Sequence, residues 1–131
     1  MDTLIVDTHG RTELVDVTGL LARSLAQSGV RSGVLVAYVP HTTAGLTINE
    51  NADPSVPRDL LMTLERLVPR SLPFAHGEGN ADAHVKASLM GSSVVVPVED
   101  GRLQLGTWQG VYFCEFDGPR RRRLLVRALP A

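Results

Sequence analysis

The sequence predicts an α+β fold, a layered sandwich of mostly antiparallel strands with about three helices, built by residues 1–131 as one domain. Three observations predict it. The strand-like segments are short and bounded by turn residues, three other segments carry helix signals, and the chain beyond residue 91 contains strand patterns only. Strands segregated from helices in this way are typical of α+β folds, whereas parallel α/β folds need regular alternation.

Five elements are expected in the first 50 residues: strands at Thr3–Asp7 and Thr12–Val17, a helix from Asp16 or Thr18 to about Ser28, and strands at Val34–Val39 and Ala44–Asn49. Gly29 can end the helix in a left-handed conformation. Val34–Val39 is apolar at consecutive positions, which predicts a central strand covered on both faces. Pro40 ends this strand.

Two further helices are expected in the middle of the chain. Asp53-Pro54 is a typical helix start, and a leucine-rich stripe at helical spacing continues to Pro69. The stretch Arg70–Gly79 has no period and is expected to be a loop. A third helix should begin near Asn80 or Asp82 and end at Gly91. Its inward face is expected to carry Ala81, Val85 and Leu89, with His84 on the same side.

The remaining segments read as four strands: Ser92–Val98, Arg102–Leu105, Val111–Phe116 and Arg122–Leu129. Asp-Gly pairs lie at residues 100–101 and 117–118, and such turns mark antiparallel hairpins. The sequence therefore predicts a four-stranded meander after the third helix.

Composition excludes several classes of function. The formal net charge is −1, so no overall positive field attracts nucleic acid. The arginine run Arg120–Arg123 is interpreted as a solvated hairpin arm and not as a nucleic-acid patch. No apolar stretch approaches the ~18 residues of a membrane span. Cys114 is the only cysteine, and the chain starts without a basic leader, which together favour a reducing, cytoplasmic location. Cys114 itself is expected to be structural.

The segment HTTAGLTINENAD, from His41 to Asp53, is the richest in chemistry. Its turn could present Thr42, Thr43 and backbone N–H groups to a phosphate, because glycine permits close backbone approach. The alternative is that both threonines only satisfy the turn's own backbone. Glu50 lies in a segment headed for burial, so its carboxylate is expected to have a histidine, a metal or several N–H donors as partner.

Three histidines from different segments could converge: His41, His76 and His84. Together with Glu50 they could bind a divalent metal such as Mg²⁺ or Zn²⁺, act as general acid and base, or donate hydrogen bonds to phosphate as imidazolium groups. A single histidine on such a helix is more often a satisfied core residue, and the spacing does not force convergence.

The segment LGTWQG contains the only tryptophan. Trp108 could stack on a heteroaromatic ring while Gln109 hydrogen-bonds the edge of that ring, or it could anchor the core at a strand bend. Both readings are open from the sequence.

Three segments resemble the YjbQ-type family of secondary thiamine-phosphate synthases: HTTAGLTINENADPSVPRDL, NADAHVKASLMGSS and DGRLQLGTWQGVYFCEFDGPRRRR. The resemblance extends from Asp16 to the end of the chain. It implies a YjbQ-like α+β fold that assembles as a homotrimer with polar pockets near the subunit contacts. It also implies a capacity to join a pyrimidine diphosphate to a thiazole phosphate, forming thiamine phosphate and releasing pyrophosphate.

The residues combine with this resemblance into one hypothesis: a weak transferase of the thiamine-phosphate synthase type that takes small phosphorylated ligands. The assigned roles are catalysis by His41, Glu50 and His84, substrate binding by Thr42, Thr43, Asn49, Trp108 and Gln109, and metal binding by His41, His76 and His84. Two alternatives stay open. The chain could be a non-catalytic trimeric protein that binds a metal or a phosphorylated ligand, or a metal-dependent hydrolase.

Overall fold

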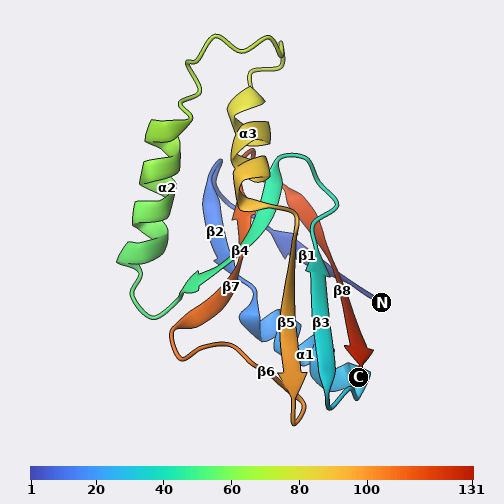
Figure 1. Cartoon of the computed structure of the whole chain (residues 1–131). Helices are drawn as coiled ribbons and strands as arrows, with labels where there is room; N and C mark the ends of the chain where they lie inside the picture. The colour runs from blue at the N-terminus through green and yellow to red at the C-terminus, as the bar shows by residue number, and fades with distance from the viewer.

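The computed structural model describes all residues 1–131, which form three helices and eight strands (Figure 1). In chain order the elements are β1 (Asp2–Asp7), β2 (Glu13–Asp16), α1 (Thr18–Ser28), β3 (Gly33–Tyr38), β4 (Ala44–Glu50), α2 (Ser55–Leu67), α3 (Ala81–Met90), β5 (Ser93–Glu99), β6 (Arg102–Leu103), β7 (Gln109–Glu115) and β8 (Arg121–Pro130). The predicted α+β class is confirmed, and no helix is long and apolar enough to cross a membrane.

The strands form two sheets in which every pairing is antiparallel. One sheet has five strands in the order β1-β8-β3-β5-β6, and the other has three in the order β2-β7-β4. We call them sheet A and sheet B. The predicted hairpin at Asp100-Gly101 joins β5 to β6.

The predicted meander is wrong beyond that hairpin. β7 lies in the centre of sheet B, whereas β8 lies in sheet A between β1 and β3. The turn Asp117-Gly118-Pro119 therefore carries the chain from one sheet to the other. The turn residues signal a change of direction, but strand pairing is decided by tertiary contacts that the turn does not encode.

Strand β7 shows how the layers stack, because all its residues from Gly110 to Glu115 are buried. Val111 and Phe113 point into the main core between the two sheets, which α1 closes at one end. Tyr112 and Cys114 point the other way, into a smaller core beneath α2 and α3. Figure 1 shows these two helices side by side on the sheet B side of the molecule. Cys114 is structural as predicted, and burial raises the pKa of its thiol to about 12.

The outer face of sheet A is uncovered in the single chain. Strand β3 was expected to be covered on both faces, but only Leu35 and Ala37 are buried, and Tyr38 is 46% exposed. Further apolar side chains on strands of sheet A are also exposed: Ile5 at 48%, Val95 at 58% and Leu129 at 44%. This chain alone therefore leaves an apolar sheet face in contact with solvent.

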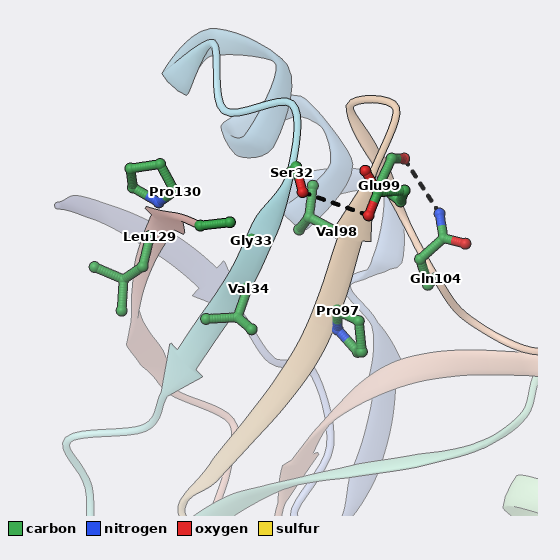
Figure 2. A pocket seen from close by; sticks show the side chains of 10 residues that line it. Ser32, Gly33, Val34, Pro97, Val98, Glu99, Gln104, Leu129 and Pro130 are labelled. Carbon is green, nitrogen blue, oxygen red and sulfur yellow. Dashed lines mark hydrogen bonds between the residues drawn. The ribbon is translucent and has the colours of Figure 1, made fainter.

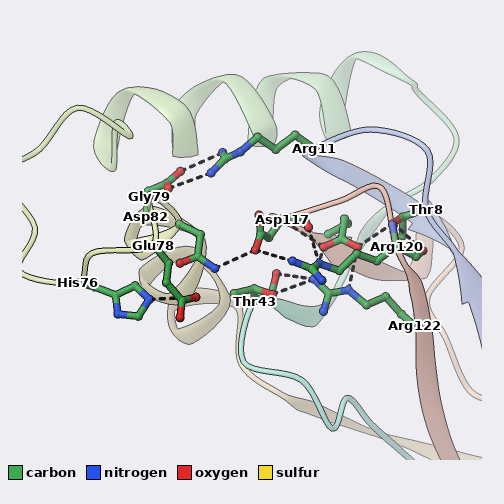
Figure 3. Close-up of polar contacts among 12 residues, drawn as sticks. Thr8, Arg11, Thr43, His76, Glu78, Gly79, Asp82, Asp117, Arg120 and Arg122 are labelled. Atoms are coloured by element: carbon green, nitrogen blue, oxygen red, sulfur yellow. Dashed lines mark hydrogen bonds and ion pairs between the residues drawn. The ribbon is translucent and has the colours of Figure 1, made fainter.

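Helix α3 buries Ala81 as predicted, but the rest of its buried face differs from the prediction. Val85 and Leu89 are exposed, whereas Asp82, Ala83, Lys86 and Ala87 are buried. Lys86 donates to Asp82 at 3.0 Å and to Glu65 of α2 at 2.7 Å. Figure 3 shows the Arg11 guanidinium in contact with the same Asp82 carboxylate. A buried lysine and aspartate are tolerated because each charge has a partner. This ionic cluster ties α2, α3 and the β1–β2 connection together.

Candidate functional site

An open cavity with two lobes lies at the end of the sandwich where β3 stops and β4 begins. His41, Thr42 and His84 border both lobes. The first lobe, about 510 Å³, is otherwise lined by small residues: Ala44, Ala87, Ser88, Gly91 and Ser92. The second, about 360 Å³, is polar except for Pro40 and is completed by Thr43, Glu78, Asn80, Asp117, Arg120 and Arg122. We call these the small-residue lobe and the polar lobe.

Of the three histidines that could converge, His41 and His84 border the same cavity. His41 follows β3 directly, and His84 lies on α3, which packs on β4. Gly45 makes this close packing possible, because a Cβ there would lie 2.6 Å from the carbonyl oxygen of Gly91. The Thr42 hydroxyl and the His84 imidazole have no hydrogen-bond partner in the chain, so both are available to a ligand.

The His41 ring is fixed by the backbone of β8. Its Nε2 accepts a hydrogen bond from the Arg123 N–H at 2.9 Å. Burial, together with the positive charges of Arg122 and Arg123, lowers the pKa of His41 below its ordinary value of 6.5. The lowered pKa and the N–H that Nε2 accepts both favour the neutral imidazole for His41 over the imidazolium donor, which was one of the options left open by the sequence.

A buried ion pair that the sequence analysis missed lies beside the polar lobe, and its arginine, Arg122, lines that lobe and is labelled in Figure 3. Arg122 was read as part of a solvated arm, but its side chain is buried and its Nε lies 2.8 Å from Glu115 Oε1. Arg122 also donates to the Thr43 hydroxyl at 2.8 Å, and the Thr8 hydroxyl donates to Glu115 at 2.7 Å. Thr43 therefore anchors the loop after His41, which matches the structural reading of that threonine.

The pair was detectable in principle. Glu115 lies two residues after Phe113 and four after Val111, so it shares their inward-facing side of β7. Arg122 shares the inward-facing side of β8 with Leu124 and Val126 in the same way. An acid and a base that continue two apolar rows are expected to meet each other inside the sandwich. The runs of arginine around Arg122 hid this pattern.

The three predicted metal ligands do not assemble into a metal site within this chain. His76 and His84 are in edge-to-face contact with ring centroids 5.2 Å apart, and His76 Nε2 lies 3.6 Å from Glu78. His41 is not in ring contact with that pair, and its Nε2 already accepts the Arg123 N–H. No group of three His, Cys, Asp or Glu side chains in the chain is arranged to hold a metal ion. The donor set thus does not fit the three-histidine ligation that the sequence suggested.

Four of the predicted site residues lie at the other end of β4. His41 precedes this strand and Glu50 ends it, and six residue steps along a strand span about 20 Å. Asn49 and Glu50 pair in register with Gly110 and Gln109, next to Trp108. The prediction that Glu50 joins the histidines is therefore wrong for the single chain, and its carboxylate has no hydrogen-bond or ion-pair partner there.

Trp108 and its neighbours form a surface cluster at that end. Trp108 is 62% exposed, so the core-anchor reading is wrong and the stacking reading stays a prediction. The Gln109 side chain accepts from the Gly106 N–H at 2.9 Å, and the Asn49 side chain accepts from the Glu50 N–H at 2.7 Å. Both amides therefore stabilise local backbone through their oxygen atoms.

Another cavity, of about 410 Å³, lies at the opposite end of β3 from His41 (Figure 2). It is bounded by Gly33, Pro97, Leu129 and Pro130, with Glu99 at its edge accepting hydrogen bonds from Ser32 and Gln104. It contains no histidine and no basic side chain, so it lacks the groups that the proposed chemistry requires.

The two-layer sandwich with helices on one side and a polar histidine pocket at its end defines a YjbQ-like α+β protein. The family model described as "UPF0047 protein YjbQ-like" matches residues 2–131, and the chain belongs to this family. It is 52% identical over 124 residues to the UPF0047 protein of Methanocaldococcus jannaschii, covering 95% of this chain and 90% of that protein. It is 48% identical over 130 residues to YugU of Bacillus subtilis, covering 98% of each.

Solved structures show the same fold. An uncharacterized conserved protein of the YjbQ/UPF0047 family from Clostridium acetobutylicum matches with a TM-score of 0.97 at 48% identity, covering 98% of this chain and 100% of that chain. A YjbQ-like protein from Sulfolobus solfataricus matches with a TM-score of 0.95 at 33% identity, covering 99% of this chain and 96% of that one.

Proposed function

We propose that the pocket between His41 and His84 binds a small phosphorylated molecule and carries a weak transfer of the thiamine-phosphate synthase type. In that reaction a pyrimidine diphosphate and a thiazole phosphate join, and pyrophosphate leaves. The observation that carries the proposal is the composition of the cavity, in which the unpartnered groups of His41, Thr42 and His84 stand between a polar lobe and a small-residue lobe. A phosphate fits the polar lobe, and a compact ring fits the small-residue lobe.

The charges of the polar lobe are consistent with weak activity. Arg122 is paired with Glu115, and Arg120 lies 3.2 Å from Asp117. Each guanidinium that could neutralise pyrophosphate thus already has a carboxylate partner. Leaving-group stabilisation would therefore depend on neutral donors and on a Mg²⁺ ion held mainly by the substrate phosphates, for which Glu78 is the carboxylate of the lobe without an arginine partner.

A non-catalytic binding role is the second candidate, and one observation favours it. The transfer needs positive charge at the leaving pyrophosphate and an oriented acid or base, but both arginines of the cavity are already paired with carboxylates and the His84 imidazole has no hydrogen-bond partner to orient it. A protein that only binds the ligand needs neither feature.

Growth of a thiamine auxotroph that carries the gene separates the two candidates. Complementation that is lost with His84→Ala and kept with Leu89→Ala, a change on the same helix at an exposed residue that lines neither lobe, would support the transferase. Failure of the wild-type gene to complement, with pyrophosphate binding intact in the purified protein, would support the binding role. A purified protein that binds no phosphorylated ligand would contradict both.

The exposed face of sheet A supports the predicted homotrimer. Tyr38, Val95 and Leu129 are exposed there, and an apolar hollow of about 280 Å³ lies beside Tyr38. A second copy that covers this face would bury apolar area. Light scattering should give a mass of three chains, and Val95→Arg should reduce it, whereas Val85→Arg on α3 should not. A 14.1 kDa particle for the wild type would contradict the proposal.

A cytoplasmic location stays a prediction.

A further inference from the structure

His41 has a defined hydrogen-bonding state that follows from the end of strand β3. The pairing of β3 with β8 stops at Tyr38 and Leu125, while β8 continues to Arg121. Arg123 lies on this extension, and its N–H has no strand partner on the β3 side. The His41 ring takes the place of the missing strand residue and accepts that N–H at 2.9 Å through Nε2.

An imidazole nitrogen that accepts a hydrogen bond carries no proton. In a neutral imidazole the other nitrogen must then carry it, so the backbone of β8 selects the tautomer that is protonated at Nδ1. No atom of the chain accepts a hydrogen bond from His41 Nδ1. The ring borders both lobes of the cavity, where this N–H is an unused donor.

We propose that His41 is a fixed Nδ1–H donor that recognises an anionic oxygen of the ligand and does not bind a metal ion. The inference rests on the proposed function and names the side-chain group that recognises the ligand in the cavity. Metal ligation through Nε2 would require His41 to give up the Arg123 N–H. Ligation through Nδ1 would require the ring to lose its only proton. Each nitrogen therefore has to give up a proton or a hydrogen bond before it can bind a metal.

Two amide substitutions separate the two nitrogens of His41. In His41→Asn an amide group occupies the position of Nδ1, so it can donate to the ligand but leaves the Arg123 N–H without its acceptor. In His41→Gln an amide group occupies the position of Nε2, so it can accept from Arg123 but provides no donor at the Nδ1 position.

The experiment is calorimetric titration of wild type and both variants with pyrophosphate in the presence of a chelator, together with thermal unfolding. We expect His41→Asn to bind within about threefold of wild type with a lowered Tm. We expect His41→Gln to keep the Tm and to lose at least about tenfold in affinity, because a hydrogen bond to a charged group is lost. Equal affinities of the two variants would overturn the donor role and leave His41 as a cap of the β8 backbone.

Long-range ¹H–¹⁵N spectra of the imidazole provide a test that needs no ligand. The proposal predicts a protonated Nδ1 and an unprotonated Nε2 for His41 at pH 7, with no change on adding Zn²⁺. A ring protonated at Nε2, or a Zn²⁺-dependent shift of His41, would overturn the inference while leaving the proposed function intact. If the wild type binds no pyrophosphate, the proposed function fails, and the donor role fails with it.

Discussion

Glu115 and Arg122 face each other inside the end of the sandwich, and their side chains are 0% and 5% exposed. They come from different sheets, so this contact adds an ionic link between β7 of sheet B and β8 of sheet A to the apolar core that already packs the sheets together. Both residues also contact threonines, Thr8 and Thr43, that belong to the loops at this end. Arg122 therefore lines the polar lobe and at the same time links the two sheets.

Removing one member of this pair should be costly. Arg122→Met keeps the volume of the side chain but leaves the Glu115 carboxylate buried without its guanidinium partner. We expect a loss of about 3–5 kcal/mol in the free energy of unfolding, measured by urea denaturation. Arg123→Met, at the exposed neighbouring position, should change that free energy by less than about 0.5 kcal/mol. Similar losses for both variants would contradict a specific role of the buried pair.

The same pair predicts how stability depends on pH. Burial alone raises the pKa of Glu115, but hydrogen bonds from Arg122, Thr8 and the Asp117 N–H outweigh burial, so its pKa lies below the ordinary 4.5. A lowered folded-state pKa means that this stabilisation is complete above 4.5 and is lost as the pH falls through the folded-state pKa. The free energy of unfolding, measured from neutral to acidic pH, should therefore decrease once the pH is lower than 4.5.

A variant shows whether Glu115 carries this effect. Glu115→Gln removes the titrating group, so its free energy of unfolding should be lower than that of wild type at neutral pH and should depend less on pH below 4.5. Parallel pH profiles for the variant and the wild type would assign the acid sensitivity to other carboxylates, such as Asp82.

Gly33 is required where β3 approaches β8 (Figure 2). A Cβ at this position would lie 1.9 Å from the carbonyl oxygen of Leu129, and its φ of +148° is rare for other residues. Gly33→Ala should lower the Tm clearly because the backbone of both strands must move. Gly19→Ala is the control, because a Cβ there meets nothing within 4 Å and Gly19 lies in helix α1. That change should raise stability, by up to about 0.5–1 kcal/mol.

Trp108 tests the stacking prediction at the other end of β4. Because its side chain is 62% exposed, Trp108→Ala should change the free energy of unfolding by less than about 0.5 kcal/mol. If the indole stacks on a heteroaromatic ligand, its fluorescence should be quenched by a pyrimidine phosphate but not by pyrophosphate. Unchanged fluorescence with both compounds would remove Trp108 from the candidate site.

Much of the fold follows from local patterns in the sequence. Glycine residues predict the helix ends at Gly29 and Gly91, and the pair Asp100-Gly101 predicts the β5–β6 hairpin. The assignment of β7 and β8 to different sheets could not be read in this way. Their connection has the residues of an ordinary turn, and the contacts that separate the strands, such as Thr8 with Glu115, are distant in sequence.

The candidate site was also predicted only in part, because several of its contacts join residues that are distant in sequence. His41 and His84 could be brought together because each interrupts an element that is otherwise apolar. The buried cluster of Lys86 and Asp82 was not predicted, because their other partners Arg11 and Glu65 come from remote segments. Glu50 was placed with the histidines because it is near His41 in sequence, but an extended strand carries nearby residues far apart.

The most direct measurement of the central claim is a crystal structure of the protein grown with pyrophosphate and Mg²⁺. The account predicts pyrophosphate in the polar lobe, with an oxygen within hydrogen-bonding distance of His41 Nδ1 and of the Thr42 hydroxyl. Ordered pyrophosphate at another place, such as the Trp108 surface, with the cavity between His41 and His84 filled only by water, would contradict it.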